Sequence, residues 1–164
     1  KFSGCNIGGS GTPSTPNAWY YNNDEATYGI DGTRKCGLLY NWYACKLLND
    51  NRSELVPGWH VPTNDEWTAL ANAVGGTSTA GTKLKATNVS WATSWGGTDD
   101  YGFEVLPAGY YDGSFGNVGS SANFWAVTES GSYAYYRYFD TGATVGQGTY
   151  YKDRGYSVRL VKDS

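Results

Sequence analysis

The sequence predicts an α+β domain in which two helices come first and an antiparallel sheet follows. The helical half is indicated by apolar residues at spacings of three and four within residues 39–75. The sheet half is indicated by short β-prone pieces that alternate with glycine turns from Phe103 onward. A chain of 164 residues suits one domain that buries roughly two thirds of the surface exposed when unfolded.

The first helix is predicted to begin near Asn41, in the stretch GLLYNWYACKLL. A short amphipathic helix is indicated by helical spacing of Leu39, Trp42, Tyr43, Lys46 and Leu47. A buried strand is the alternative interpretation of the same stretch.

The second helix is predicted in HVPTNDEWTALANAVGG. Thr63 and Glu66 form the pattern of a capping box, and Gly75 stands where a helix C-terminus favours positive φ. Its apolar stripe consists of Trp67, Leu70, Ala71 and Val74. The stretches after it, GTKLKA, VSWATSW and GGTDDYG, are dense in turn residues and signal no further helix.

The strand-prone pieces are FEVLPAGYY, NFWAVT, YAYYRYF and GYSVRLV. The last of them, residues 156–161, alternates apolar and polar positions and is predicted to be a central strand whose apolar face meets the helices. We expect Trp42, Trp67 and Trp125 to be buried beneath the tyrosines of the later strands.

Residues 1–18 are rich in Gly, Ser, Thr and Pro, which predicts an extended lead-in or linker with little core, and residues 19–164 form the domain. The three cysteines Cys5, Cys36 and Cys45 allow at most one internal disulfide, and the leftover thiol could join another chain. This odd count and the absence of Met favour a processed extracellular chain or a piece of a longer one.

Charge and hydropathy exclude two classes of partner. The net charge is −3 and the twelve Lys and Arg residues are scattered singly, so nucleic acid is not an expected partner. The apolar runs are far shorter than the roughly 18 residues of a membrane helix, so no membrane insertion is expected.

Six motifs, in order, carry a resemblance to a known family: GLLYNWYA, PGWHVPTNDEW, GTDDYGF, LPAGYYDGSF, FWAVTES and GYSVRLV. Over about residues 17–163 the chain resembles the Fibrobacter succinogenes major paralogous domain. The resemblance implies a C-type lectin-like fold, in which two helices pack on a twisted antiparallel sheet with long loops. It also implies kinship with the variable proteins of diversity-generating retroelements, whose C-terminal part is a ligand-binding face. Members are mostly surface, secreted or phage proteins without established enzyme activity.

One departure from the family concerns its usual cysteine. Members commonly carry Cys-Pro before the GWH motif, where this chain has Val56-Pro57, so that disulfide cannot form. Cys36 and Cys45 can pair with each other, or Cys5 with either, and the sequence leaves this open.

No catalytic set is complete, so an enzyme is not expected. The only histidine is His60, and no cysteine follows Cys45, which removes the late cysteine pair that formylglycine-generating relatives of the fold need for copper. Zinc motifs are absent. The acidic residues Glu104, Asp112, Glu129 and Asp140 show no spacing that singles out a glycosidase pair.

A structural calcium is the one cofactor that the residues leave open. Asp99 and Asp100 in GGTDDYGF offer oxygen ligands, although such residues in turns usually bond to their own backbone. The sugar-binding calcium motifs of C-type lectins do not occur, so we expect no cofactor otherwise.

An aromatic surface is the remaining functional candidate. Residues 110–156 hold nine of the fifteen tyrosines together with Asn, Ser and Gly, a composition typical of a contact surface. In residues 132–140 we expect Tyr136, Tyr138 and Asp140 to point outward, with Arg137 facing inward against a carboxylate such as Glu129.

The sequence therefore predicts a non-catalytic recognition or adhesion module on a cell or virion surface, binding a protein or carbohydrate. The alternative is a structural subunit or terminal domain of a surface fibre or phage particle, self-assembling through the N-terminal segment. The predicted binding residues are Tyr111, Asp112, Phe115, Asn117, Asn123, Tyr136, Tyr138, Asp140, Tyr150, Tyr151 and Arg154. We expect Tyr150, Tyr151 and Arg154 to join Tyr136 and Tyr138 in one partly exposed patch.

Overall fold

The computed structural model describes residues 2–8, 14–29 and 32–164 and confirms the α+β class. Within these ranges it has a 3-10 turn, Tyr21–Asn23, and five α-helices: α1 Glu25–Tyr28, α2 Trp42–Asp50, α3 Arg52–Leu55, α4 Asn64–Ala73 and α5 Thr77–Leu84. The strands are β1 Asn6–Ile7, β2 Asn17–Tyr20, β3 Leu38–Tyr40, β4 Trp59–His60, β5 Tyr110–Tyr111, β6 Phe115–Gly116, β7 Ala122–Ser130, β8 Tyr133–Phe139, β9 Val145–Tyr151 and β10 Val161–Lys162. No helix in this part of the chain is long and apolar enough to cross a membrane.

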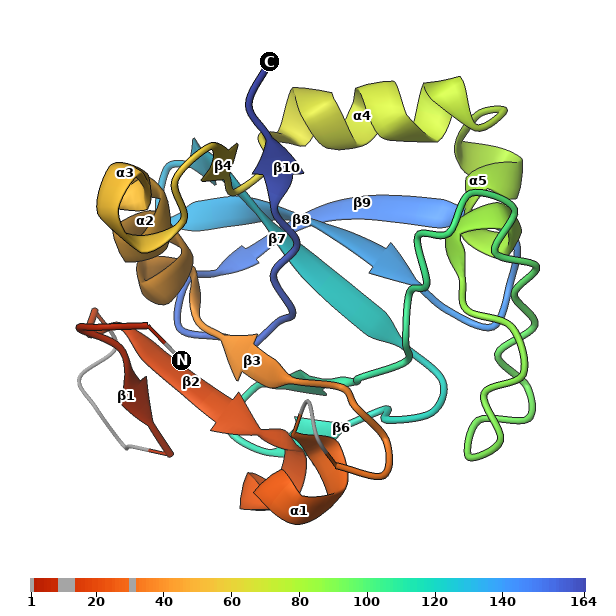
Figure 1. The fold of residues 1–164 in the computed structure, drawn as a ribbon, viewed down its shortest axis with the longest axis horizontal. Helices are drawn as coiled ribbons and strands as arrows, with labels where there is room; N and C mark the ends of the chain where they lie inside the picture. Colours follow the sequence, from red (N-terminus) through yellow and green to blue (C-terminus); the bar gives the residue numbers. More distant parts are fainter. Residues whose placement is uncertain (1, 9–13, 30–31) are drawn as a thin grey trace.

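The largest sheet is the antiparallel β7-β8-β9 sheet, which crosses the middle of the molecule (Figure 1). A second sheet, β1-β2-β3, lies at the N-terminal side, and two short pairs, β10-β4 and β5-β6, complete the pairing. In Figure 1, α4 and α5 lie along one side of the large sheet and α2 and α3 gather at its other end. The expected pair of helices is thus extended by α5 and by the single turns α1 and α3.

Helix α2 begins where the sequence predicts. The Asn41 side-chain oxygen accepts hydrogen bonds from the backbone N–H groups of Ala44 and Asn17, each at 3.0 Å. One side chain thereby caps the helix and holds it against β2. Trp42 and Cys45 face the core, with 2% and 0% of their surface exposed.

Helix α4 confirms the predicted capping box. Thr63 Oγ1 accepts a hydrogen bond from the Glu66 N–H at 3.2 Å, and Glu66 Oε2 accepts one from the Thr63 N–H at 2.8 Å. Gly75 follows the helix with φ of 108°, the positive value expected there.

Helix α5 corrects the expectation that no helix follows Gly75. Its sequence TSTAGTKL has weak helical propensity, so tertiary packing stabilises it. Ala80 and Leu84 are 0% and 1% exposed. A Cβ at Gly81 would lie 2.6 Å from the carbonyl oxygen of Ala143, so glycine lets the helix approach the loop before β9.

The C-terminal segment is only partly the predicted central strand. Tyr156 exchanges two backbone hydrogen bonds with Tyr40, at 2.7 and 2.9 Å, and Ser157 bonds to Asn123 and Trp125 of β7. The segment therefore joins the two sheets at this point. Residues 158–160 are not in a strand, and β10 begins only at Val161. The prediction of one continuous strand over residues 156–161 was therefore wrong.

Two tryptophans tie α2 and β3 to β7 reciprocally. The indole N–H of Trp42 donates to the Ala126 carbonyl at 3.0 Å, and that of Trp125 donates to the Tyr40 carbonyl at 2.8 Å. The predicted burial of Trp42, Trp67 and Trp125 is confirmed, with exposures of 2%, 3% and 0%. Their predicted place beneath the tyrosines of β8 holds for Trp42 and Trp125, but Trp67 packs in the other core cluster with Phe124.

The N-terminal segment contributes to the core, in contrast to the expectation. Its strand β1 pairs in parallel with β2, and Cys5 and Ala18 are 3% and 0% exposed. No disulfide joins the three cysteines, all of which lie in described ranges. Cys36 packs in a different cluster from Cys45, whereas Cys5 lies close enough to Cys45 to help raise the pKa of that thiol, after the larger effect of burial.

Arg137 points inward as expected but has a different partner. Its side chain is buried and donates to the Asn64 carbonyl at 2.9 Å and to Thr68 Oγ1 at 2.6 Å, at the start of α4. Glu129 instead forms an exposed ion pair with Lys152 at 2.9 Å. Neutral oxygens of α4 thus bind the Nη2 group of the buried guanidinium, whereas its Nε has no partner among the described residues.

Candidate binding surface

The hairpin of β8 and β9 presents tyrosine rings that lie across glycines of the neighbouring strand. The register pairs Tyr136 with Gly148 and Tyr138 with Gly146. A Cβ at Gly146 would lie 1.9 Å from the Tyr138 ring, and one at Gly148 would lie 2.7 Å from the Tyr136 ring. Glycine at both positions therefore lets the rings lie flat against β9. The two ring centroids are 5.9 Å apart.

Tyr150 continues this row toward the end of β9. Strand alternation places it on the same face as the two glycines, and its proximity to Tyr136 contributes to the raised pKa of that residue, after burial and Tyr138. Beneath the row, the ring of Tyr156 lies 5.0 Å from that of Tyr136 and is 5% exposed. The tyrosine row is defined here as Tyr136, Tyr138 and Tyr150.

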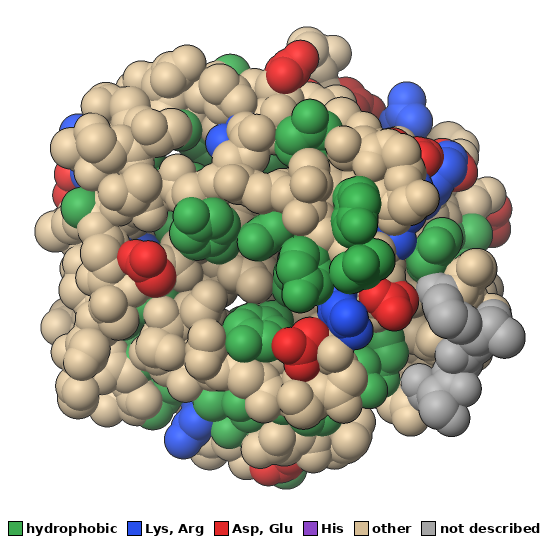
Figure 2. All heavy atoms as spheres, turned by 180° about the vertical axis from the view of Figure 1, so that it is seen from behind, with side chains coloured by type: hydrophobic (Ala, Val, Ile, Leu, Met, Phe, Trp, Pro, Cys, Tyr) green, Lys and Arg blue, Asp and Glu red, His purple; other side chains and the backbone are tan. Residues whose placement is uncertain are grey.

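Tyr151 extends the surface around the edge of the sheet. The register places it opposite Tyr133 and on the other face, with ring centroids 4.9 Å apart, yet its ring is also 5.6 Å from Tyr150. Tyr138, Tyr150 and Tyr151 are 37%, 39% and 49% exposed, which confirms their predicted partial exposure. Figure 2 shows hydrophobic side chains gathering near the middle of one face, with acidic and basic side chains among them.

Arg154 links the row to the loop that follows β5. Its guanidinium carbon lies 5.7 Å from the ring centroids of both Tyr150 and Tyr151. Its Nη1 donates to the Asp112 carbonyl at 2.7 Å, and its Nε, 3.7 Å from Asp153 Oδ1, makes no hydrogen bond within the described chain. The predicted association of Arg154 with the tyrosines is confirmed.

A second aromatic group includes two of the predicted site residues. Tyr111 stacks on Trp19 with centroids 4.5 Å apart and lies 4.9 Å from Phe115, which in turn lies 5.2 Å from Tyr21. Two backbone hydrogen bonds, 2.9 and 2.7 Å, tie Tyr111 to Gly155. Tyr111 and Phe115 are half-buried, so they border the surface more than they form it.

Three further predicted site residues lie apart from both aromatic groups. Asn123 is 7% exposed and its Oδ1 accepts a hydrogen bond from Ser121, so its assignment to an open face was wrong. Asn117 is exposed with φ of 58° and forms a turn. Asp140 is exposed, but its Oδ1 accepts the Gly142 N–H at 2.7 Å and stabilises its own loop.

The structure also places a residue that the sequence reasoning missed. Strand alternation puts Tyr133 on the same inward face as Arg137, but Tyr133 is 38% exposed because it begins β8 beyond the helices that cover that face. The neighbouring Gly131, with φ of 59°, marks the hairpin turn and could have indicated that Tyr133 stands at a solvent-exposed strand end.

The calcium candidates lie in a turn of their own. The Asp99 carboxylate accepts the Glu104 N–H at 2.8 Å, the local backbone bonding that is usual for Asp in turns. Across the described ranges, no group of three His, Cys, Asp or Glu side chains lies where it could hold a metal ion.

His60 has a structural position between two carboxylates. Its Nε2 lies 2.7 Å from Glu66 Oε1, and its Nδ1 lies 2.7 Å from Asp163 Oδ1. Partial burial lowers the pKa of His60, but the hydrogen bonds to Asp163 and Glu66 outweigh it, and the pKa is raised. The contact joins the C-terminal segment to α4.

A family profile, described as the Fibrobacter succinogenes major domain, matches residues 6–162. The chain belongs to this family. No curated protein and no solved structure is significantly similar to this member of the family. The match includes β1 and the rest of the described N-terminal strands, in keeping with their place in the core.

Proposed function

We propose that this chain is a non-catalytic recognition or adhesion module that acts on a cell or virion surface. The tyrosine row, with Tyr151 and Arg154 beside it, is the part that contacts a protein or glycan. The proposal rests chiefly on one observation, the flat packing of tyrosine rings over glycines on an open strand pair. Rings held in this way lose little side-chain entropy on binding, which favours Tyr in contact surfaces.

The finer fold assignment is part of this proposal. We propose that the domain is a C-type lectin-like branch related to the variable proteins of diversity-generating retroelements. Support comes from the family membership and from the pairing of the C-terminal segment with β3, near the chain's beginning. In such relatives the C-terminal part of the fold carries the variable ligand-binding face, which in this chain corresponds to β8 and β9.

The fibre-subunit alternative loses one of the two observations that favoured it. That alternative rested on the odd number of thiols and on Cys5 reaching a neighbouring chain from the N-terminal segment. Cys5 is 3% exposed and packs among Ala18, Leu38 and Ala44, so its sulfur faces the core. The recognition module is therefore the function that the structure supports better.

The test begins with an array of glycans and extracellular proteins, on which the unmodified chain identifies a retained ligand. Tyr138→Ala and Tyr150→Ala are then compared with Tyr101→Ala, which removes an equally large side chain, 57% exposed, outside the row. Each row variant should weaken binding by about 2 kcal/mol, roughly thirtyfold, if these residues are central contacts. Circular dichroism and thermal unfolding of each variant check that the fold is retained.

Two outcomes would contradict the proposal. Undiminished binding by both row variants would remove the tyrosine row from the contact. A loss with Tyr101→Ala equal to that with the row variants would indicate unspecific adhesion to exposed aromatic side chains.

A further inference from the structure

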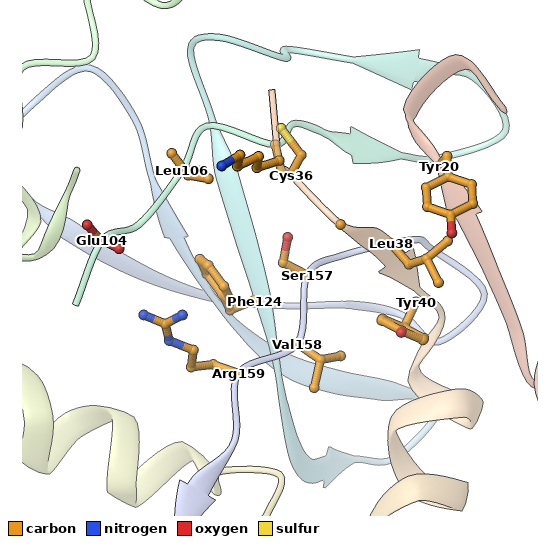
Figure 3. Close-up of a pocket in the computed structure, with 13 residues that line it drawn as sticks. Tyr20, Cys36, Leu38, Tyr40, Glu104, Leu106, Phe124, Ser157, Val158 and Arg159 are labelled. Atoms are coloured by element: carbon orange, nitrogen blue, oxygen red, sulfur yellow. The ribbon is translucent and has the colours of Figure 1, made fainter. Parts of the chain in front are cut away.

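A cavity of about 390 Å³ lies where β3, β7 and the C-terminal segment diverge (Figure 3). Its volume is within the range of ordinary small-ligand sites. It shares no residue with the tyrosine row. Its lining consists of Tyr20, Lys35, Cys36, Gly37, Leu38, Tyr40, Glu104, Leu106, Ala108, Phe124, Ser157, Val158 and Arg159.

The cavity forms because the backbone hydrogen bonding between β3 and the C-terminal segment ends after one residue pair. Tyr40 and Tyr156 exchange both of their backbone hydrogen bonds, and alternation directs the N–H and C=O groups of Leu38 and Val158 toward the same gap. Leu38 and Val158 do not bond to each other, and no other described residue takes their place on this edge. Two strand-like segments thus line the cavity with main-chain donors and acceptors open to a ligand.

The charged lining favours an anion. Two cations, Lys35 and Arg159, face a single carboxylate, Glu104. Arg159 is fixed in position because its guanidinium donates to the Phe103 carbonyl and lies 4.3 Å from the Phe103 ring centroid. Burial lowers the pKa of Arg159, with Glu104 and, to a smaller extent, Asp99 opposing the change, but a guanidinium keeps its charge at neutral pH.

Lys35 is the second cation, and its backbone is held in an uncommon conformation. It has φ of 51°, and Glu104 across the same cavity has φ of 54°. Such left-handed residues other than glycine cost energy and concentrate at ligand sites. The Lys35 amine makes no ion pair or hydrogen bond with a described residue, so it is available to a ligand.

The remaining walls combine apolar side chains with the hydroxyl groups of Tyr20, Tyr40 and Ser157. Figure 3 shows the Ser157 hydroxyl directed toward the side of the cavity where Cys36 lies, with Phe124 beside Ser157 and Leu106 across from it. Ser157 donates no hydrogen bond through its side chain to a described residue. An apolar side chain of a ligand can pack against Phe124 while its polar groups reach the open edge.

We propose that this cavity binds the end of an extended peptide through its C-terminal carboxylate. Lys35 and Arg159 would hold the carboxylate, and the last amide group would bond to the open backbone of Leu38 and Val158. A peptide offers the alternating N–H and C=O groups that the two edges lack, which a simple acid or a sugar does not. The site is independent of the tyrosine row, so either proposal can fail without the other.

The test is a nuclear magnetic resonance titration of the isotope-labelled chain with acetyl-Ala-Leu-Leu bearing a free carboxylate. The amide signals of Leu38 and Val158 should shift during the titration, because their N–H groups line the cavity. The same peptide with a C-terminal amide should bind about tenfold more weakly, since it lacks the charge. Galacturonate is the third probe, an acid of similar size without a peptide backbone.

Lys35→Gln should weaken the free-carboxylate peptide about fivefold, since one exposed charge contact is lost. Lys162→Gln is the matched control, because it removes the same charge from an exposed residue outside the cavity. Lys35 has an exposed side chain, so the fold should survive its change.

Three results would overturn the proposal. Equal binding of the amide peptide would remove the carboxylate from recognition. Signal shifts confined to residues away from the cavity would place the peptide elsewhere. Shifts of Leu38 and Val158 with galacturonate but not with either peptide would assign the cavity to a small acid instead.

Discussion

The two faces of the β7-β8-β9 sheet are both aromatic, yet they use different rings. The face toward α4 and α5 is closed by Phe and Trp, with the Phe124 and Phe139 rings 5.9 Å apart and Trp67 packed 5.6 Å from Phe124. The other face carries the tyrosine row, whose outer members are more than a third exposed.

The difference lies in the hydroxyl groups. On the closed face the indole N–H of Trp95 donates to the Val105 carbonyl at 2.8 Å, so its polar atom is satisfied within the chain. The hydroxyls of Tyr138 and Tyr150 make no hydrogen bond with a described residue. The indole N–H of Trp67, on the closed face, is buried and has no partner among the described residues. The closed face therefore keeps its polar atoms away from water, whereas the open face leaves hydroxyl groups accessible to water or a partner.

The largest expected effect is the difference in stability loss between a substitution on the closed face and one on the open face. Phe139→Ala should lower the free energy of unfolding by about 3–5 kcal/mol, because the fully buried ring leaves a cavity. Its neighbour Tyr138, replaced by Ala, should cost about 1 kcal/mol or less, since the side chain is 37% exposed. Urea unfolding of both variants measures the difference. Comparable losses would mean that the tyrosine row is core.

A smaller effect is expected where a ring meets a glycine. Gly146→Ala places a methyl group where the Tyr138 ring lies, 1.9 Å from its nearest atom, so the ring must rotate away from β9. The expected loss of stability is about 1–2 kcal/mol, accompanied by altered ring-proton chemical shifts of Tyr138. Gly142→Ala, in the loop before β9 and 3.0 Å from Asp140, is the control. Unchanged Tyr138 signals in Gly146→Ala would show that the ring does not depend on this glycine.

The smallest expected effect is the pH dependence of stability that arises from His60, which contacts Glu66 of α4. The raised pKa of His60 means that its contribution to stability is fully present below the unfolded value of about 6.5 and is lost as pH rises through the folded value. Because Glu66 and Asp163 are 38% and 46% exposed, screening limits the effect to less than about 1 kcal/mol.

The measurement is the free energy of unfolding between about pH 6 and about pH 8.5, for the unmodified chain and for His60→Gln. The unmodified chain should be the more stable at the lower pH, and the variant should lose this slope. A slope that persists in His60→Gln would assign the titration to other groups.

The elements with local signals were predictable from the sequence. The capping box of Thr63 and Glu66 and the cap at Asn41 each involve residues close together in the sequence. Such local patterns predict where a helix begins. Helix α5 could not be predicted in this way, because Gly81 and Ala80 favour it only when the loop before β9 lies against them.

The candidate surface was predictable in composition but not in register. Alternation placed Tyr136 and Tyr138 together correctly, yet it could not reveal that Tyr150 shares their face and Tyr151 does not. That depends on the pairing of β9 with β8, which is fixed by Gly146 and Gly148 beneath the rings. The cavity at Leu38 and Val158 was not predicted, because no sequence pattern indicates that the backbone pairing ends after Tyr40 and Tyr156.

The reciprocal bonds of Trp42 and Trp125 have a consequence for how the chain folds during synthesis. They join residues that are 84 and 85 positions apart in the sequence. Forming these contacts therefore costs the entropy of closing a long loop of chain. A nascent chain that ends before β7 exposes Trp42 without its acceptor and presents an apolar surface to chaperones or other chains. Folding should therefore be slow, on the order of milliseconds to seconds, and should begin only when the second half of the chain has left the ribosome.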